Sequence, residues 1–329
     1  MTVADPLAAR LAPHRERFAE VAREVGRVLV GQESLVQKML VGLLADGHVL
    51  LEGVPGLAKS LAAQSLAVAL GGTFRRIQFT PDLLPADLVG TQVFQPKTGE
   101  WTVREGPIFG HFVLADEINR APAKVQSALL EAMQERQVSL AGETRKLPEP
   151  FLVLATQNPI EHEGTYALPE AQVDRFMLKL LLDYPSAEEE FAIVGRMATN
   201  RAKPVARAVT TPAAVLEARA LVDEVHVEER LVRYVLALVA ATRQPKAAGL
   251  DALVPWIRFG ASPRASVALT QAARAHAFLA GRGFATPHDV RALAPDVLRH
   301  RIAMSFEAMA DGITSEQVIA QLLERLPVP

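Results

Sequence analysis

The chain has 329 residues, enough for two domains that each have a core. Lys and Arg number 35 against 37 Asp and Glu, so the formal charge of -2 gives no reason to expect a nucleic acid or an anionic membrane as partner. The lack of cysteine excludes disulfides and cysteine-ligated metals, and no apolar run reaches the roughly 18 residues of a membrane span. We therefore expect a cytoplasmic protein without a membrane span.

The first half of the chain alternates helical patterns with short apolar runs. Apolar positions at helical spacing over residues 7–46 are interrupted near Gly31. Short runs rich in Val, Leu and Phe then follow at residues 48–53, 74–79, 111–117, 150–158 and 176–182. Such runs predict the buried strands of a mainly parallel five-stranded sheet, and helical stretches such as 59–70 and 123–136 separate several of them. The pattern predicts an α/β core of three layers, with helices on both faces of the sheet.

Two segments and the second half of the chain depart from this alternation. Residues 91–108 and 137–150 place KTGE and AGET between alternating apolar positions, which predicts two inserted β-hairpins. After residue 184 the strand-like runs largely stop, and helical patterns with Ser, Thr or Pro at their starts follow. We predict an α/β core with N-terminal helices over residues 1–184 and an all-α domain over residues 185–329.

The stretch LLEGVPGLAKS, residues 50–60, contains most of a phosphate-binding loop. In the usual pattern G-x-x-x-x-G-K-[ST], Gly53, Lys59 and Ser60 match, but Ala58 stands where the last glycine belongs. Its methyl group costs on the order of 1 kcal/mol if the backbone is left-handed there, and little otherwise. The departure weakens the motif without breaking it, although an ordinary strand-turn-helix would fit the stretch taken alone.

The chemistry of such a loop assigns roles to its residues. The glycines allow tight turns, and the N-terminus of the following helix directs free N–H groups at an anion. Lys59 would reach the terminal phosphates, and the Ser60 hydroxyl would bind Mg²⁺. The predicted nucleotide-binding segment consists of Gly53, Val54, Pro55, Gly56, Leu57, Ala58, Lys59, Ser60 and Leu61.

Polar residues end two of the later strands. HFVLADE ends in Asp116 and Glu117, at the carboxyl edge where open α/β sheets bind ligands. Asp116 can bind Mg²⁺ directly or through water, and Glu117 can take a proton from an attacking water. FLVLATQN ends in Asn158, whose amide can hold that water in line with a γ-phosphate, although an asparagine before proline is also a common turn residue.

The set GVPGLAKS, VLADEINRA, LATQNPIEHEGTYALPEAQVDRF and GASPRA closely resembles the AAA+ ATPases of the MoxR family, over nearly the whole chain and in the family's order. The family tolerates alanine at the position of Ala58. The two hairpins match the helix-2 insert and the insert before the sensor-1 strand of this branch of AAA+ proteins. The resemblance implies that residues 1–184 are the nucleotide-binding core and that residues 185–329 are its lid.

The resemblance also implies roles for four further residues. Gly31 and Gln32 would lie against the adenine side of the nucleotide, unless LVGQE is a plain loop. Arg175 is similar to the arginine finger that reaches the γ-phosphate of a neighbouring subunit, with an Asp174–Arg175 ion pair as the alternative and Arg120 as the rival finger. Arg264 resembles the sensor-2 arginine, which links the lid to the phosphates.

The resemblance implies an ATP-hydrolysing chaperone that remodels, assembles or activates protein complexes, with ATP or ADP and Mg²⁺ as its ligands. It implies a homo-oligomeric ring, of six subunits, and a separate protein client or adaptor such as a von Willebrand A domain protein. Two other functions stay open. A nucleic-acid motor is disfavoured by the acidic balance, and a magnesium-chelatase-type subunit differs only in its client.

Overall fold

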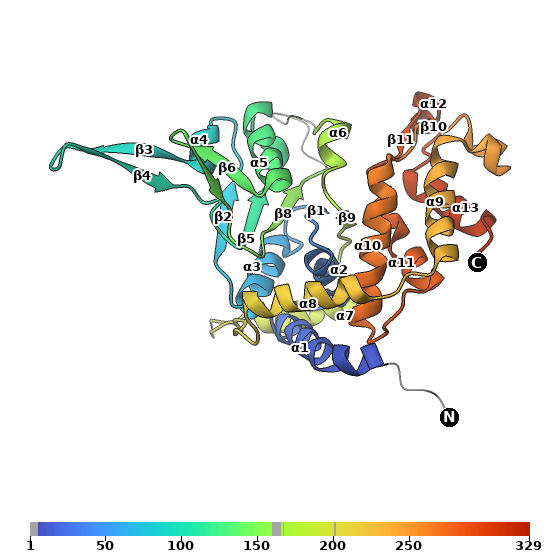
Figure 1. Cartoon of the computed structure of the whole chain (residues 1–329), viewed down its shortest axis with the longest axis horizontal. Helices are drawn as coiled ribbons and strands as arrows, with labels where there is room; N and C mark the ends of the chain where they lie inside the picture. Colours follow the sequence, from blue (N-terminus) through green and yellow to red (C-terminus); the bar gives the residue numbers. More distant parts are fainter. Residues whose placement is uncertain (1–5, 160–165, 167, 201) are drawn as a thin grey trace.

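The structure is a computed structural model that describes residues 6–159, 166, 168–200 and 202–329. Its centre is a five-stranded parallel sheet with the strand order β2-β5-β8-β1-β9 (Figure 1). The strands are β1 (Val49–Glu52), β2 (Phe74–Gln78), β5 (Phe112–Asp116), β8 (Leu152–Gln157) and β9 (Leu178–Leu181). The five predicted strands are thereby confirmed, each slightly shorter than its run. The prediction that all of them are buried needs a correction, because β2 lies at an edge of the sheet and is largely exposed.

The sheet separates two hydrophobic clusters, because successive residues of a strand face opposite sides. In β5, Phe112 and Leu114 belong to one cluster, and Val113 and Ala115 belong to the other. The first cluster includes buried residues of α1 (Pro6–Val28), α2 (Glu33–Leu44) and α3 (Lys59–Ala69), and the second includes those of α4 (Pro85–Val89) and α5 (Ala123–Glu135). The predicted three-layer core is confirmed.

Both predicted hairpins are present. β3 (Gly90–Gln95) pairs with β4 (Glu100–Glu105), and β6 (Gln137–Leu140) pairs with β7 (Glu143–Lys146), each antiparallel. The β3–β4 hairpin projects away from the sheet (Figure 1). Among its exposed residues, Phe94 and Trp101 lie with their ring centroids 5.3 Å apart and their ring planes tilted by 54°. The first hairpin therefore carries an exposed aromatic pair.

Helices dominate the chain after β9. They are α7 (Ala187–Met197), α8 (Pro212–Glu224), α9 (Glu229–Arg243), α10 (Pro263–Leu279), α11 (Pro287–Leu298), α12 (Phe306–Ala310) and α13 (Ser315–Arg325). The prediction of an all-α domain needs one correction, because β10 (Ile257–Phe259) and β11 (Ala303–Met304) form a small antiparallel pair. These strands are too short to show an alternating pattern in the sequence. The boundary after residue 184 stays a prediction.

The remaining elements connect these parts. The turn η1 (Ile118–Arg120) follows β5, and α6 (Glu170–Val173) precedes β9. Two further 3-10 turns, η2 (Lys246–Ala248) and η3 (Asp251–Leu253), follow α9. Within the described part of the chain, no helix combines the length and apolarity needed to cross a membrane.

His48 is buried at the start of β1 and links three elements of the core. Its Nδ1 accepts a hydrogen bond from the backbone N–H of Val153 at 3.0 Å. Its Nε2, 3.1 Å from the carbonyl oxygen of Met133, then carries the proton and donates it. Burial lowers the pKa of His48 to about 3, so the folded protein keeps this ring neutral.

We expect the buried His48 to make the fold sensitive to acid. The unfolded chain binds a proton at His48 below a pH of about 6.5, whereas the folded chain does so only near 3, so stability falls as the pH drops through this window. Each pH unit within this window lowers the free energy of unfolding by about 1.4 kcal/mol at most. Between pH 7 and pH 5.5, the free energy of unfolding measured with denaturant should fall by about 1 kcal/mol less in His48→Gln than in the parent. The exposed His226→Gln is the control, and equal losses in the parent and His48→Gln would contradict the assignment.

Candidate nucleotide site

The predicted site residues come from three neighbouring strands that end at the same edge of the sheet. β1 leads into the loop before α3, β5 ends at Asp116, and β8 ends at Gln157, directly before Asn158. The loop is tied to β8, because the backbone N–H of Gly53 donates to the carbonyl oxygen of Gln157 at 3.3 Å. The parallel sheet therefore brings together residues that lie up to 105 positions apart in the sequence, as between Gly53 and Asn158.

The phosphate loop has the backbone that an anion-binding loop needs. The Nζ of Lys59 donates to the carbonyl oxygen of Gly53 at 2.5 Å, and it lies 3.5 Å from that of Gln157. Lys59 therefore points across the loop opening. Gly56 has a φ of 89°, and Ala58 has φ 56° and ψ 24°. Ala58 thus adopts the left-handed conformation in which a glycine would be unstrained.

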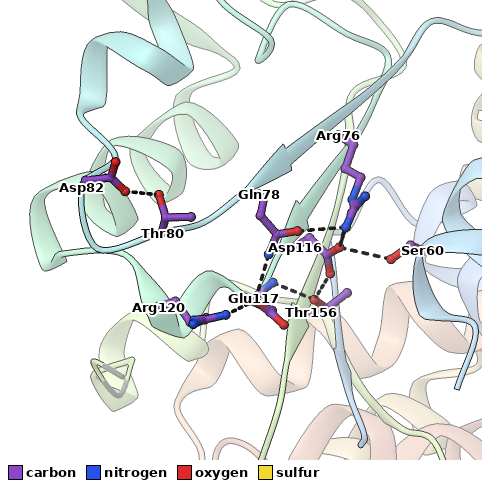
Figure 2. Close-up of polar contacts among 9 residues, drawn as sticks. All are labelled: Ser60, Arg76, Gln78, Thr80, Asp82, Asp116, Glu117, Arg120 and Thr156. Atoms are coloured by element: carbon purple, nitrogen blue, oxygen red, sulfur yellow. Dashed lines mark hydrogen bonds and ion pairs between the residues drawn. The ribbon is translucent and has the colours of Figure 1, made fainter. Parts of the chain in front are cut away.

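Asp116 is the most connected side chain of the site (Figure 2). Its Oδ1 accepts a hydrogen bond of 2.6 Å from the hydroxyl of Thr156 on β8. Its Oδ2 accepts one of 3.2 Å from the hydroxyl of Ser60 on α3. The guanidinium of Arg76 on β2 donates to this same Oδ2. Asp116 is buried, so these donors balance a carboxylate that water barely reaches.

Glu117 is held with its carboxylate at the edge of the sheet. Its backbone is left-handed, at φ 57° and ψ 52°, a conformation that costs of order 1–3 kcal/mol for a non-glycine residue. A hydrogen bond of 2.8 Å from its N–H to the Thr156 hydroxyl stabilises this turn. Its Oε2 accepts from Gln78 Nε2 at 2.8 Å and from Arg120 Nη1 at 3.0 Å (Figure 2). These two partners fix the direction of the carboxylate at the end of β5.

The oxygen atoms of the site fit a magnesium ion. Ser60 and Asp116 present a hydroxyl and a carboxylate 3.2 Å apart, next to the phosphate loop. Mg²⁺ prefers such hard oxygens and is commonly held by one or two of them together with the phosphates of its nucleotide. The two predicted metal ligands therefore lie together.

A cavity of about 180 Å³ adjoins the phosphate loop. It is smaller than the roughly 300–1,000 Å³ of typical ligand pockets, so it has room for only part of a nucleotide. Gln32 belongs to its wall, which is largely apolar, and Gly31 precedes it with a φ of 69°. The cavity is lined by Val28, Leu29, Val30, Gln32, Gly56, Leu57, Ala58, Leu61, Pro185, Ile193, Arg196, Met197 and Pro204. Gln32 and the phosphate loop thus share one cavity wall, and the adenine contact of Gly31 and Gln32 stays a prediction.

Arg175 and Arg264 lie at the opposite edge of the sheet. Arg175 precedes β9, and the first residue of β9 is paired with the first residue of β1. Because the phosphate loop follows the other end of β1, a strand length of roughly 13 Å separates Arg175 from the loop. Both arginines line one cavity, which also includes His48 and Asp174. Arg264 Nη1 is 4.0 Å from Asp174 Oδ2. The predicted link of Arg264 to phosphates stays a prediction.

The two alternatives considered for the arginine finger have different partners here. Asp174 pairs with Arg301 of the second domain at 2.7 Å, instead of forming the predicted alternative pair with Arg175. The Nε of Arg175 is buried and has no hydrogen-bond partner among the described residues. Arg120 is bound to Glu117 of its own chain. Residues 160–165 and 167, part of the stretch between Asn158 and Arg175, lie outside the described residues.

Three residues of the site were not predicted. Thr156 orients both Asp116 and Glu117. The feature of the sequence that could have revealed it is its polar side chain within the apolar run FLVLATQN. Arg76 and Gln78 reach the same two carboxylates from β2. Their two-residue spacing on one strand was the available signal, because such residues share a face.

Comparisons with known proteins agree with this site. Residues 48–178 match the family described as "ATPase family associated with various cellular activities (AAA)", and residues 255–322 match the AAA lid domain. The chain is 51% identical to Chaperone MoxR1 of Mycobacterium tuberculosis over 93% of this chain and 81% of that protein. It is 42% identical to the protein YeaC of Bacillus subtilis over 95% of each. A crystal structure of a protein assigned as an ATPase from Cytophaga hutchinsonii matches with a TM-score of 0.92 at 46% identity, covering 98% of this chain and 97% of that one.

The fold and the site define an AAA-type ATPase, with a nucleotide-binding core followed by a helical lid. Within that class, the chain belongs to the MoxR family, because its identity to MoxR1 extends over nearly its whole length. The resemblance seen in the sequence motifs is confirmed.

We expect Ala58→Gly to stabilise the protein. Glycine removes the steric cost of the left-handed backbone but gains freedom in the unfolded chain, which leaves a net gain of about 0.5–1 kcal/mol. ATP turnover should change by no more than severalfold, because the loop already has its working conformation. Urea unfolding measures the first effect, with Ala67→Gly inside α3 as the control that should lose about 1 kcal/mol or more. Equal losses in both variants would contradict the strain at Ala58.

Proposed function

We propose that this protein hydrolyses ATP to ADP and phosphate with Mg²⁺ and uses the cycle to remodel, assemble or activate protein complexes. The observation that supports this proposal most is the placement of Asp116 and Glu117 at the end of β5, with Asp116 bonded to Ser60 of the phosphate-binding segment and Glu117 oriented by Gln78 and Arg120. A site that only bound a nucleotide would not need an oriented carboxylate at this edge. The chaperone part of this proposal is based on the name of the similar protein Chaperone MoxR1.

Each residue of the site has a task in this reaction. Lys59 and the N–H groups of the loop bind the β- and γ-phosphates, and Ser60 and Asp116 hold the metal. Mg²⁺, when bound, neutralises the charge that develops on the phosphates. Glu117 accepts the proton of the attacking water, which Asn158 orients. Gly31 and Gln32 hold the adenine at the wall of the adjoining cavity.

The position of Arg175 supports a ring in which it acts on a neighbour. It lies a strand length from its own phosphate loop, so it reaches no phosphate within its own chain. Arg264 shares its cavity and would face the same neighbouring site. A closed ring, of six subunits, would place this edge of one subunit against the nucleotide edge of the next.

The hairpins support a protein client more than a nucleic acid. Arg145 in the second hairpin already pairs with Glu105 at 3.3 Å and with Glu143 at 3.1 Å, so its charge is balanced within the chain. Phe94 and Trp101 form an exposed aromatic pair on the first hairpin. Such a pair suits an apolar segment of a protein client, which would be a separate chain, for instance one with a von Willebrand A domain.

The first prediction from this proposal separates binding from turnover. Glu117→Gln should keep ATP binding but lose at least roughly a hundredfold in turnover, the usual scale for loss of a general base. Lys59→Ala should instead lose binding. Fluorescent-nucleotide titration and phosphate release measure the two effects, and the exposed Glu131→Gln is the matched control. Turnover near the parent rate in Glu117→Gln would show that the base is elsewhere.

The second prediction tests the ring. An Arg175→Ala subunit keeps Lys59, Asp116 and Glu117, and a Lys59→Ala subunit keeps the finger, so mixed rings contain some complete interfaces. Two inactive proteins should then regain activity together, because arginine fingers given in trans are worth on the order of a thousandfold or more. Phosphate release across mixing ratios is the measurement, after subunit exchange and with mixed assembly confirmed by size. No recovery at any ratio would argue against Arg175 and favour Arg120.

A further inference from the structure

Arg76 contacts the site but has no task in the reaction described above. It lies on β2, the edge strand next to β5, and donates to Asp116 Oδ2 from Nη2 at 2.6 Å and from Nε at 3.0 Å. Ser60 donates to this same oxygen at 3.2 Å (Figure 2). Arg76 therefore engages the one carboxylate oxygen that faces the serine of the proposed metal site.

A guanidinium and a divalent metal compete for this oxygen. Both are cations, and they would repel each other across one partly buried carboxylate. The other oxygen of Asp116 is less available to a metal, because it accepts the hydrogen bond from Thr156 and the side chain is only 10% exposed. The Arg76 side chain is 53% exposed and can turn into solvent at little cost. The geometry therefore allows the metal to replace the arginine.

Arg76 also connects the metal side of the site to its base. Its Nη2 donates to Gln78 Oε1 at 2.9 Å, and Gln78 Nε2 donates to Glu117 Oε2 at 2.8 Å. Loss of the Arg76 contact would leave the Gln78 amide with fewer restraints. The position of Arg76 thus bears on how Glu117 is held.

We propose that Arg76 is a resident counter-ion of Asp116, and that a magnesium–nucleotide complex must displace it to fill the site. This inference rests on the proposed function. Arg76 acts through Asp116, and is therefore a positioning residue. It raises the concentration of magnesium–nucleotide that the site needs before it fills, and it keeps the buried carboxylate paired until then.

The test compares nucleotide affinity with and without metal. The full-length parent, Arg76→Gln and Arg76→Lys are titrated with a fluorescent, non-hydrolysable β,γ-imido ATP analogue, once in EDTA and once in saturating Mg²⁺. Removing the competing cation should lower the Kd in Mg²⁺ by about three- to tenfold. This fold-change corresponds to the contribution of one partly exposed, charge-assisted hydrogen-bonded pair. The Kd in EDTA should change less than twofold. Arg76→Lys keeps a charge without the paired donors and should lie between parent and Arg76→Gln.

Matched controls separate this role from others. Arg75→Gln removes the same charge from the neighbouring position of β2, which faces the other side of the strand, and should leave both Kd values at the parent level. Thermal unfolding of each variant shows whether it is folded.

The possible results lead to different conclusions. A Kd in Mg²⁺ that is unchanged or weaker in Arg76→Gln would overturn the inference. Equal weakening in EDTA and in Mg²⁺ would also overturn it, and would make Arg76 a phosphate ligand. A parent chain that binds the analogue under neither condition would instead overturn the proposed function, and this inference with it.

Discussion

The carboxylate of Asp116 is the contact on which the arrangement of the site depends. Thr156 from β8, Ser60 from α3 and Arg76 from β2 all donate to it, so one buried side chain joins three elements to the end of β5. A buried carboxylate is costly unless such donors surround it. The strand ends, the phosphate loop and the turn at Glu117 are thus held in one relative position.

The sheet also separates two groups of charged residues. Its carboxyl edge carries the phosphate loop and the two acidic residues, whereas its amino edge carries Arg175 beside the second domain. The residues on either side of Arg175 are tied to that domain, because Arg301 donates to Asp174 Oδ1 at 2.7 Å and to the carbonyl oxygen of Phe176 at 2.7 Å. A movement of the second domain relative to the core would therefore also move Arg175.

Local patterns in the sequence were sufficient for most of the fold and the central site residues. The strands that lead to these residues are apolar runs bounded by turn residues, and a parallel sheet brings the ends of such runs to one edge, so Lys59, Asp116 and Asn158 could be placed together. Features set by tertiary contacts could not be predicted. The role of Arg76 depends on β2 lying beside β5, which is a matter of strand order. The place of Arg264 depends on how the lid packs on the core.

A structure of Glu117→Gln with ATP and Mg²⁺ would test the account most directly. We predict the triphosphate on the loop over residues 53–60, the metal at Ser60 with Asp116 beside it, and the adenine in the cavity lined by Gln32. We also predict that Arg175 reaches a phosphate of a neighbouring subunit. A nucleotide bound in the cavity of Arg175 and Arg264 of its own chain, with the loop empty, would contradict it.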